Sequence, residues 1–210
     1  MLAVAPAVVA TAPQGSAAPA ALAGLIQSHY ANVKSFTADF TRTFKGGLLP
    51  QTTVQKGDVK IQKPGRMRWT YRKPDDMEFV ADGKMLYSYI KADRTVYVTD
   101  VPTGDGVSTA ILFLAGKGDL VRDFRASAAP VAPSTSANEW RVELTPKTPQ
   151  AEFTKLTLGV DAKSLKLTMM ETVDADGGVS TFRFENLREN VSLGDREFVF
   201  TPPKGVDVIR

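Results

Sequence analysis

The sequence predicts a mainly β fold, in which one N-terminal helix precedes about eleven strands of a large, curved or barrel-like antiparallel sheet. Three observations support this prediction. Apolar residues recur first at helical spacing and later at every second position. Turn residues separate the alternating segments at short intervals, which is typical of an antiparallel meander. The chain has 210 residues, 43% of them hydrophobic, which favours one large domain over two small ones.

The first predicted element is an amphipathic helix over residues 20–33. Its apolar positions recur at helical spacing at Ala21, Leu22, Leu25, Ile26, His29 and Tyr30. His29 is the single histidine of the chain and lies on the apolar face or at its edge. A histidine in such a place packs against neighbours far more often than it binds a ligand, so we expect a packing role.

Eleven segments follow that are predicted to be strands. They are residues 35–44, 52–62, 66–71, 77–81, 84–91, 94–99, 139–145, 153–160, 164–173, 179–187 and 197–201. In the first of them Phe36, Ala38, Phe40 and Phe44 share one face. Gly, Pro and Asp residues occupy the short connections, as turns require.

Two segments interrupt this pattern. Residues 126–138 are rich in Ala, Ser and Pro, and we expect a flexible loop there. Residues 108–115 are apolar around the whole helical circumference and are flanked by glycines on both sides. Such a helix must be buried, and two interpretations remain open. It is either a core helix that plugs the open end of the sheet or a hinged lid over an apolar cavity, with residues 107–122 as the lid segment.

The first nineteen residues are mostly Ala, Val and Pro and contain no Lys or Arg. They are either the remainder of a secretory signal peptide or a disordered tail. Residues 20–210 are expected to form a single domain. No run approaches the roughly 20 consecutive apolar residues of a membrane span, so we expect none.

Composition excludes several classes of chemistry. There is no cysteine and one histidine, which rules out thiol catalysis, disulfide frameworks and multi-His metal sites. Phosphate-binding glycine motifs are absent, and paired aspartates fall in turns. We therefore expect no enzyme, no catalytic residue, no metal and no cofactor. The net charge is +3 with both signs scattered, which argues against a nucleic-acid partner.

Several motifs carry a family resemblance. They are residues 36–40 (FTADF), 64–69 (PGRMRW), Tyr71, Pro74, Val80, residues 82–84 (DGK), Leu86, Tyr87, Tyr89 and residues 198–206 (FVFTPPKGV). In this order they cover essentially all of residues 20–210. The chain resembles the bacterial outer-membrane lipoprotein carrier family (LolA).

The resemblance implies a periplasmic carrier with an unclosed β-barrel of about eleven strands, capped by helices that act as a lid. In that family the acyl chains of a lipoprotein are received from an inner-membrane ABC lipoprotein-release complex, shielded, and handed to an outer-membrane lipoprotein receptor. We expect a monomer with acylated lipoproteins as cargo. Two alternatives remain open: a carrier of another lipid, such as a glycolipid or polyene product, and a lipid-sensing regulatory or assembly module of the same fold.

Candidate site residues follow from strand parity and from the resemblance. The predicted lipid cavity is lined by Phe36, Phe40, Met67, Trp69, Tyr71, Met85, Tyr87, Tyr89, Leu167 and Met169. The same residues would form a closed core if their face is not concave. The predicted lid residues are Ile111, Leu112, Phe113 and Leu114.

The resemblance also implies a latch for the lid. The family usually has an Arg before the proline of the central motif, where it hydrogen-bonds carbonyl groups of the lid, and this chain has Lys63 there. A lysine lacks the planar fork of a guanidinium, so the latch is expected to be looser or shared with Arg66. The alternative is that Lys63 is a solvated charge at the end of a strand.

Overall fold

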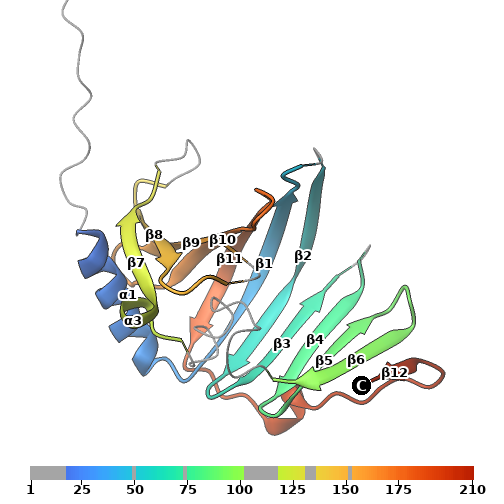
Figure 1. The fold of residues 1–210 in the computed structure, drawn as a ribbon. Helices are drawn as coiled ribbons and strands as arrows, with labels where there is room; N and C mark the ends of the chain where they lie inside the picture. Colours follow the sequence, from blue (N-terminus) through green and yellow to red (C-terminus); the bar gives the residue numbers. More distant parts are fainter. Residues whose placement is uncertain (1–17, 49–50, 73–74, 102–117, 131–135, 151–152) are drawn as a thin grey trace, which may run out of the picture.

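Twelve strands form one curved sheet in the described part of the chain (Figure 1). The computed structural model describes residues 18–48, 51–72, 75–101, 118–130, 136–150 and 153–210. The strand order is β12-β6-β5-β4-β3-β2-β1-β11-β10-β9-β8-β7. Neighbouring strands are antiparallel, except that β12 runs parallel to β6. Since β12 and β7 form separate edges, the sheet is unclosed, and the predicted mainly β fold class with an N-terminal helix is confirmed.

The bounds of the elements agree closely with most of the predicted ones. The helices are α1 (Pro19–Asn32), α3 (Leu120–Asp123) and the 3-10 helix η1 (Asp195–Phe198). The first strands are β1 (Ser35–Lys45), β2 (Thr52–Gln62), β3 (Arg66–Tyr71), β4 (Met77–Asp82), β5 (Met85–Ile90) and β6 (Thr95–Asp100). The later strands are β7 (Phe124–Ala128), β8 (Glu139–Pro146), β9 (Lys155–Asp161), β10 (Leu167–Val173), β11 (Val179–Glu189) and β12 (Asp207–Ile209).

The centre of the sheet is the long strand β1, which pairs with β2 on one side and β11 on the other. Phe36, Ala38 and Phe40 of β1 are buried on its inner face, in line with the alternation in the sequence. Gly57 of β2 lies opposite Phe40, and a Cβ atom at Gly57 would lie 2.5 Å from the Phe40 ring. The glycine therefore allows this ring to lie against the sheet.

Helix α1 packs at the β7–β8 end of the sheet (Figure 1). Its buried residues are Leu22, Ala23, Ile26 and Tyr30, which join the main apolar core. The Tyr30 hydroxyl accepts a hydrogen bond from the Leu167 backbone N–H at 2.8 Å, and burial raises the pKa of this hydroxyl. One half of the concave face is thus filled by the helix, and the other half is not.

The closing segment differs from the prediction. Residues 197–201 were predicted to be a strand, but residues 195–198 form η1, and the chain joins the sheet only at β12. Phe198 is buried, and the Phe200 ring lies 5.6 Å from that of Tyr87. The alternating aromatic residues resemble a strand because Phe198 is buried and the Phe200 ring packs onto the outer face of the sheet.

Two strands were not predicted. Residues 126–128 belong to β7 and pair with β8, so the predicted flexible loop 126–138 is wrong at its start. Strand β12 has three exposed residues, too few for a recognisable alternation. Residues 1–17 and the predicted lid residues Ile111–Leu114 lie outside the described residues. None of the helices in the described ranges has the length and apolar character needed to cross a membrane.

Candidate functional site

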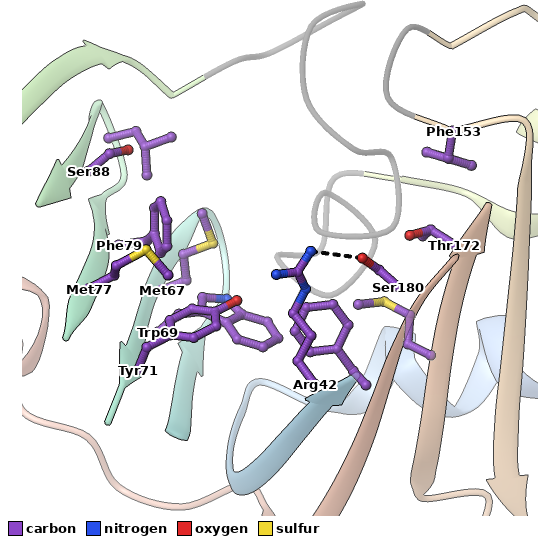
Figure 2. A pocket seen from close by; sticks show the side chains of 13 residues that line it. Arg42, Met67, Trp69, Tyr71, Met77, Phe79, Ser88, Phe153, Thr172 and Ser180 are labelled. Carbon is purple, nitrogen blue, oxygen red and sulfur yellow. Dashed lines mark hydrogen bonds between the residues drawn. The ribbon is translucent and has the colours of Figure 1, made fainter. Parts of the chain in front are cut away.

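A cavity of about 580 Å³ lies on the concave face of the sheet (Figure 2). Its lining comes from strands β1, β3, β4, β5, β10 and β11, which meet around one space because the sheet is curved. The lining residues are Arg42, Met67, Trp69, Tyr71, Met77, Phe79, Leu86, Ser88, Phe153, Met170, Thr172, Ser180 and Phe182. Both the volume and the mostly apolar wall are typical of sites for small apolar ligands.

Aromatic rings form the base of this cavity. The Phe40 ring lies 5.2 Å from Trp69 and 4.9 Å from Tyr71, and Trp69 lies 5.5 Å from Phe182. Phe79 contacts Tyr71 at 5.8 Å. Edge-to-face contacts of this kind hold the rings in defined positions, so the base of the cavity is preformed.

Three methionines complete the apolar wall: Met67 and Met77 on one side and Met170 on the other. Figure 2 shows Met67 and Met77 beside Phe79 and Trp69, across the cavity from Ser180 and Thr172. Thioether side chains are flexible and polarizable, and therefore adapt to apolar ligands of varied shape.

The one charged side chain among the described lining residues is Arg42. Its Nη1 donates to Gln55 Oε1 at 2.6 Å and its Nη2 to Ser180 Oγ at 2.8 Å. The guanidinium also lies over two rings, 5.5 Å from the centre of Phe44 and 5.8 Å from that of Phe182. Burial raises the pKa of the nearby Tyr71 hydroxyl, and the charge of Arg42 acts in the opposite direction.

The predicted cavity residues fall into three groups. Met67, Trp69 and Tyr71 line the cavity. Phe36, Phe40 and Leu167 belong to the closed core on the same face: Phe40 lies behind the rings of the base, and the Leu167 backbone bonds to Tyr30 of α1. For these three residues the alternative of a closed core describes the structure.

The remaining predicted residues lie on the other face. The cavity-facing residues of β5 are Leu86 and Ser88, so Met85, Tyr87 and Tyr89 have the opposite parity. Tyr87 and Tyr89 instead contact Phe200, at 5.6 and 5.8 Å. The assignment was wrong because aromatic content was taken to mark the cavity, whereas these rings hold the C-terminal segment against the outer face.

Met169 was assigned to the wrong face for a different reason. The register of β10 against β9 shifts between Leu167 and Met169, which indicates a β-bulge. Beyond the bulge Met170 and Thr172 line the cavity, and the Met169 side chain lies beside Gly159 on the other face. Simple alternation from Leu167 would place Met169 inside, so the bulge accounts for the error.

The two predicted latch residues bind different parts of the chain. Lys63 Nζ donates to the backbone carbonyl of Tyr30, in the last turn of α1. Burial lowers the pKa of Lys63, and the charge of Glu189 opposes this shift. Arg66 pairs with Asp195 of η1 at 2.6 Å, so it lies against the C-terminal segment. Residues 111–114 lie outside the described residues, so a contact of Lys63 or Arg66 with them stays a prediction.

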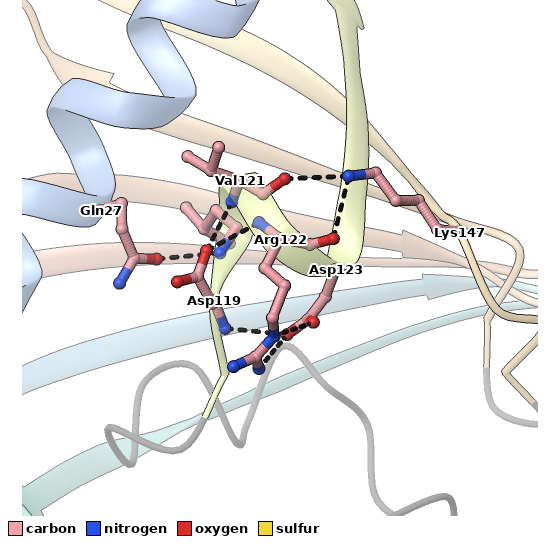
Figure 3. A network of polar contacts seen from close by, with 7 residues as sticks. Gln27, Asp119, Val121, Arg122, Asp123 and Lys147 are labelled. Atoms are coloured by element: carbon pink, nitrogen blue, oxygen red, sulfur yellow. Dashed lines mark hydrogen bonds and ion pairs between the residues drawn. The ribbon is translucent and has the colours of Figure 1, made fainter.

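Helix α3, which includes the end of the predicted lid segment 107–122, is anchored by a polar network (Figure 3). Asp119 Oδ1 accepts from the backbone N–H groups of Val121 and Arg122, at 2.9 and 2.8 Å. Gln27 of α1 accepts from the Leu120 N–H at 2.8 Å. Lys147 donates to two carbonyl groups of the helix, so α3 is joined to both α1 and the end of β8.

Other candidate sites are weaker. His29 Nε2 lies 2.9 Å from Glu189 Oε1 at the side of α1, and its ring lies 5.1 Å from that of Tyr30, so the histidine is packed against the helix. Within the described ranges, no group of three or more His, Asp or Glu side chains is arranged to hold a metal ion.

Comparison with known proteins gives the same family as the sequence motifs. The family model described as outer membrane lipoprotein carrier protein LolA matches residues 31–201. An outer-membrane lipoprotein carrier protein of Nitrosospira multiformis is 33% identical over 186 residues, which cover 89% of this chain and 87% of that protein. One of Cupriavidus pinatubonensis is 31% identical over 198 residues, covering 91% and 90% of the two chains.

Solved structures share the fold at low sequence identity. A conserved protein of Thermus thermophilus matches with a TM-score of 0.56 and 13% identity, covering 90% of this chain and 98% of the other. A DUF1329 family protein of Desulfovibrio piger matches with a TM-score of 0.51 and 12% identity, covering 87% and 98%. These similarities concern the arrangement of the strands and carry no information on ligands.

Proposed function

Because this chain belongs to the outer-membrane lipoprotein carrier family, we propose that it binds the acyl chains of lipoproteins in the concave cavity. The family consists of transport proteins rather than enzymes, which agrees with the lack of catalytic motifs in the sequence. In this proposal the protein acts in the periplasm. It receives acylated lipoproteins from an inner-membrane ABC lipoprotein-release complex and delivers them to an outer-membrane lipoprotein receptor.

The physical need for such a carrier follows from the hydrophobic effect. At about 0.8 kcal/mol per methylene, one C16 chain exposed to water costs on the order of 10 kcal/mol. A cargo with three chains costs more than twice that amount. Spontaneous passage through an aqueous compartment is therefore negligible, and a protein that shields the chains removes this cost.

The single observation that supports the proposal best is the composition of the cavity wall. Among the described residues, five aromatic residues, three methionines and one charged residue line a space of about 580 Å³. An apolar wall of this kind binds hydrocarbon without directional bonds, so the acyl chain is held mainly by its contact area. Binding of this kind suits a carrier that must also release its cargo.

The experiment that tests the proposal is native mass spectrometry of the protein isolated from its own periplasm. We expect a copurified species with the mass of an acylated lipoprotein or of its acylated N-terminal peptide after proteolysis. Recovery of a non-protein lipid alone would contradict the lipoprotein assignment and favour a carrier of another lipid. Recovery of a partner protein without any acyl chain would favour a regulatory module.

A further inference from the structure

Arg42 is an unusual residue for the wall of an apolar cavity. It lies on the same face of β1 as Phe36, Ala38 and Phe40, and its side chain points into the space between the two halves of the lining (Figure 2). A charged group next to hydrocarbon loses part of its hydration, which is unfavourable unless another group compensates. The neighbours of Arg42 therefore show whether the protein itself compensates the charge of the guanidinium.

The guanidinium is held in place by neutral partners. Gln55 and Ser180 each accept one hydrogen bond, and the rings of Phe44 and Phe182 lie against the plane of the cation. A guanidinium has five N–H donors, and these two bonds use only two of them. Within the described residues the remaining donors have no other acceptor, so a ligand can bind them while the side chain stays fixed.

No carboxylate among the described residues lies within ion-pair distance of Arg42. Asp75 is connected to it only through Gln55, whose Nε2 donates to Asp75 Oδ2 at 3.1 Å. Other half-buried arginines differ: Arg68 pairs with Glu78, and Arg141 pairs with Glu139 at 2.5 Å. Arg42 is thus an anchored cation that has no direct counter-ion in the part of the chain that the structure describes.

We propose that Arg42 makes the cavity a binding site for anionic amphiphiles, in which an apolar chain occupies the wall and a carboxylate or phosphate group binds the guanidinium. This inference rests on the proposed function, because it requires that the cavity holds acyl chains. A planar guanidinium bonds both oxygens of such a group, and apolar surroundings strengthen the attraction. A fatty acid supplies the carboxylate, and a lipid head group supplies the phosphate.

The test compares four C12 probes by isothermal titration calorimetry at low ionic strength, each below its micelle concentration. The probes are dodecanoate, dodecyl phosphate, dodecanol and dodecyltrimethylammonium. Because a hydrogen bond to a charged group contributes more than a neutral one, we expect at least one anion to bind about tenfold to a hundredfold more tightly than dodecanol. The cation should bind most weakly. Preference for dodecanoate or for dodecyl phosphate then distinguishes the two sources of the anion.

Three variants assign the effect to this residue. Arg42→Met should remove the preference for the anions over dodecanol, while Arg42→Lys should keep part of that preference. Arg125→Met is the matched control, since Arg125 is exposed on β7 and its loss changes the net charge equally.

Three results would overturn the inference. Equal affinity of the wild-type protein for the anions and dodecanol would refute it without any variant, while the proposed function would stand. A preference that persists in Arg42→Met would show that another group binds the anion. If none of the four probes binds, the proposed function fails, and this inference fails with it.

Discussion

Replacing Ser88 by Trp should block the cavity from the side of β5. Ser88 lines the cavity beside Phe79 and Leu86, and its small side chain leaves the space open (Figure 2). The strand position is half-buried, so an indole can extend into the cavity without displacing the buried core. Ser88→Trp therefore replaces ligand space with a protein side chain and should leave the fold intact.

The size of the effect follows from the area that the indole takes from the ligand. An aromatic side chain buries about 150–250 Å². At about 25 cal/mol per Å², the loss of about 150 Å² of contact weakens binding by about 4 kcal/mol, or about 500-fold. The cavity of about 580 Å³ allows a chain to shift towards Met170, so this value is an upper limit. We expect a loss of affinity of at least about tenfold.

The assay is competitive displacement of a fluorescent acyl probe by dodecanol, with thermal unfolding measured on the same samples. Ser127→Trp is the matched control, because Ser127 is exposed on β7 and is not among the lining residues. This control should bind as the wild-type protein does. If Ser88→Trp is folded and keeps wild-type affinity, acyl chains do not occupy this cavity and the reasoning is refuted.

Three further predictions concern the scaffold. Gly57→Ala should destabilise the fold by about 1–3 kcal/mol in urea unfolding, because its Cβ would collide with the Thr70 carbonyl oxygen and lie 2.5 Å from the Phe40 ring. Gly24→Ala in α1 meets open space and should stabilise the fold by about 0.5–1 kcal/mol. Tyr30→Phe should cost about 1–3 kcal/mol near neutral pH by leaving a buried N–H of β10 without an acceptor. Burial raises the pKa of Tyr30 in the folded state, so this tyrosine ionises first in the unfolded chain. The stability of the wild-type protein therefore falls as the pH rises above 10.0. The share of this loss that comes from Tyr30 should be absent in Tyr30→Phe. Lys63→Met should lower the stability in thermal unfolding by about 1 kcal/mol, because its hydrogen bond to α1 is lost. The control Lys204→Met, at an exposed position, should leave the stability almost unchanged. Equal effects of the two variants would contradict the assigned bond.

The main elements of the fold were predictable because their signals are local. Helical spacing located α1 within one residue of its observed bounds, and alternation located most strands within a few residues. The errors occurred where alternation had another cause. Phe198 and Phe200 alternate although neither belongs to a strand, since Phe198 is buried at the end of η1 and Phe200 packs on the outer face. The short strand β12 contains too few residues to show any pattern.

The cavity was predictable only in part, because parity shows which residues share a face but not which face is concave. On β3 the residues Met67, Trp69 and Tyr71 line the cavity, and their contact with lipid stays a prediction. On β5 two faces were candidates, and the choice of the aromatic one was wrong because Phe200 covers Tyr87 and Tyr89. The contact between these rings and a segment more than a hundred residues away leaves no local signal.

Arg42 was not predicted as a site residue, although the sequence contains a usable signal for it. The apolar face of β1 continues through Phe36, Ala38, Phe40 and Phe44, and Arg42 occupies the same parity. A charged residue on an otherwise apolar face is a candidate for function, because burying it is unfavourable without a partner. Most of the other missed residues come from strands whose pairing had to be known first, and Phe153 precedes β9. These residues are Met77, Phe79, Leu86, Ser88, Phe153, Met170, Thr172, Ser180 and Phe182.

The central claim is that acyl chains of lipoproteins occupy the concave face, and site-specific photo-crosslinking in living cells tests it most directly. A photo-reactive p-benzoylphenylalanine is placed at Leu86, which lines the cavity, or at the adjacent Tyr87, which lies on the outer face. We predict that irradiation links acylated lipoproteins to the protein at position 86 and not at position 87. Crosslinks to lipoproteins at position 87 alone, or equally at both positions, would contradict the account.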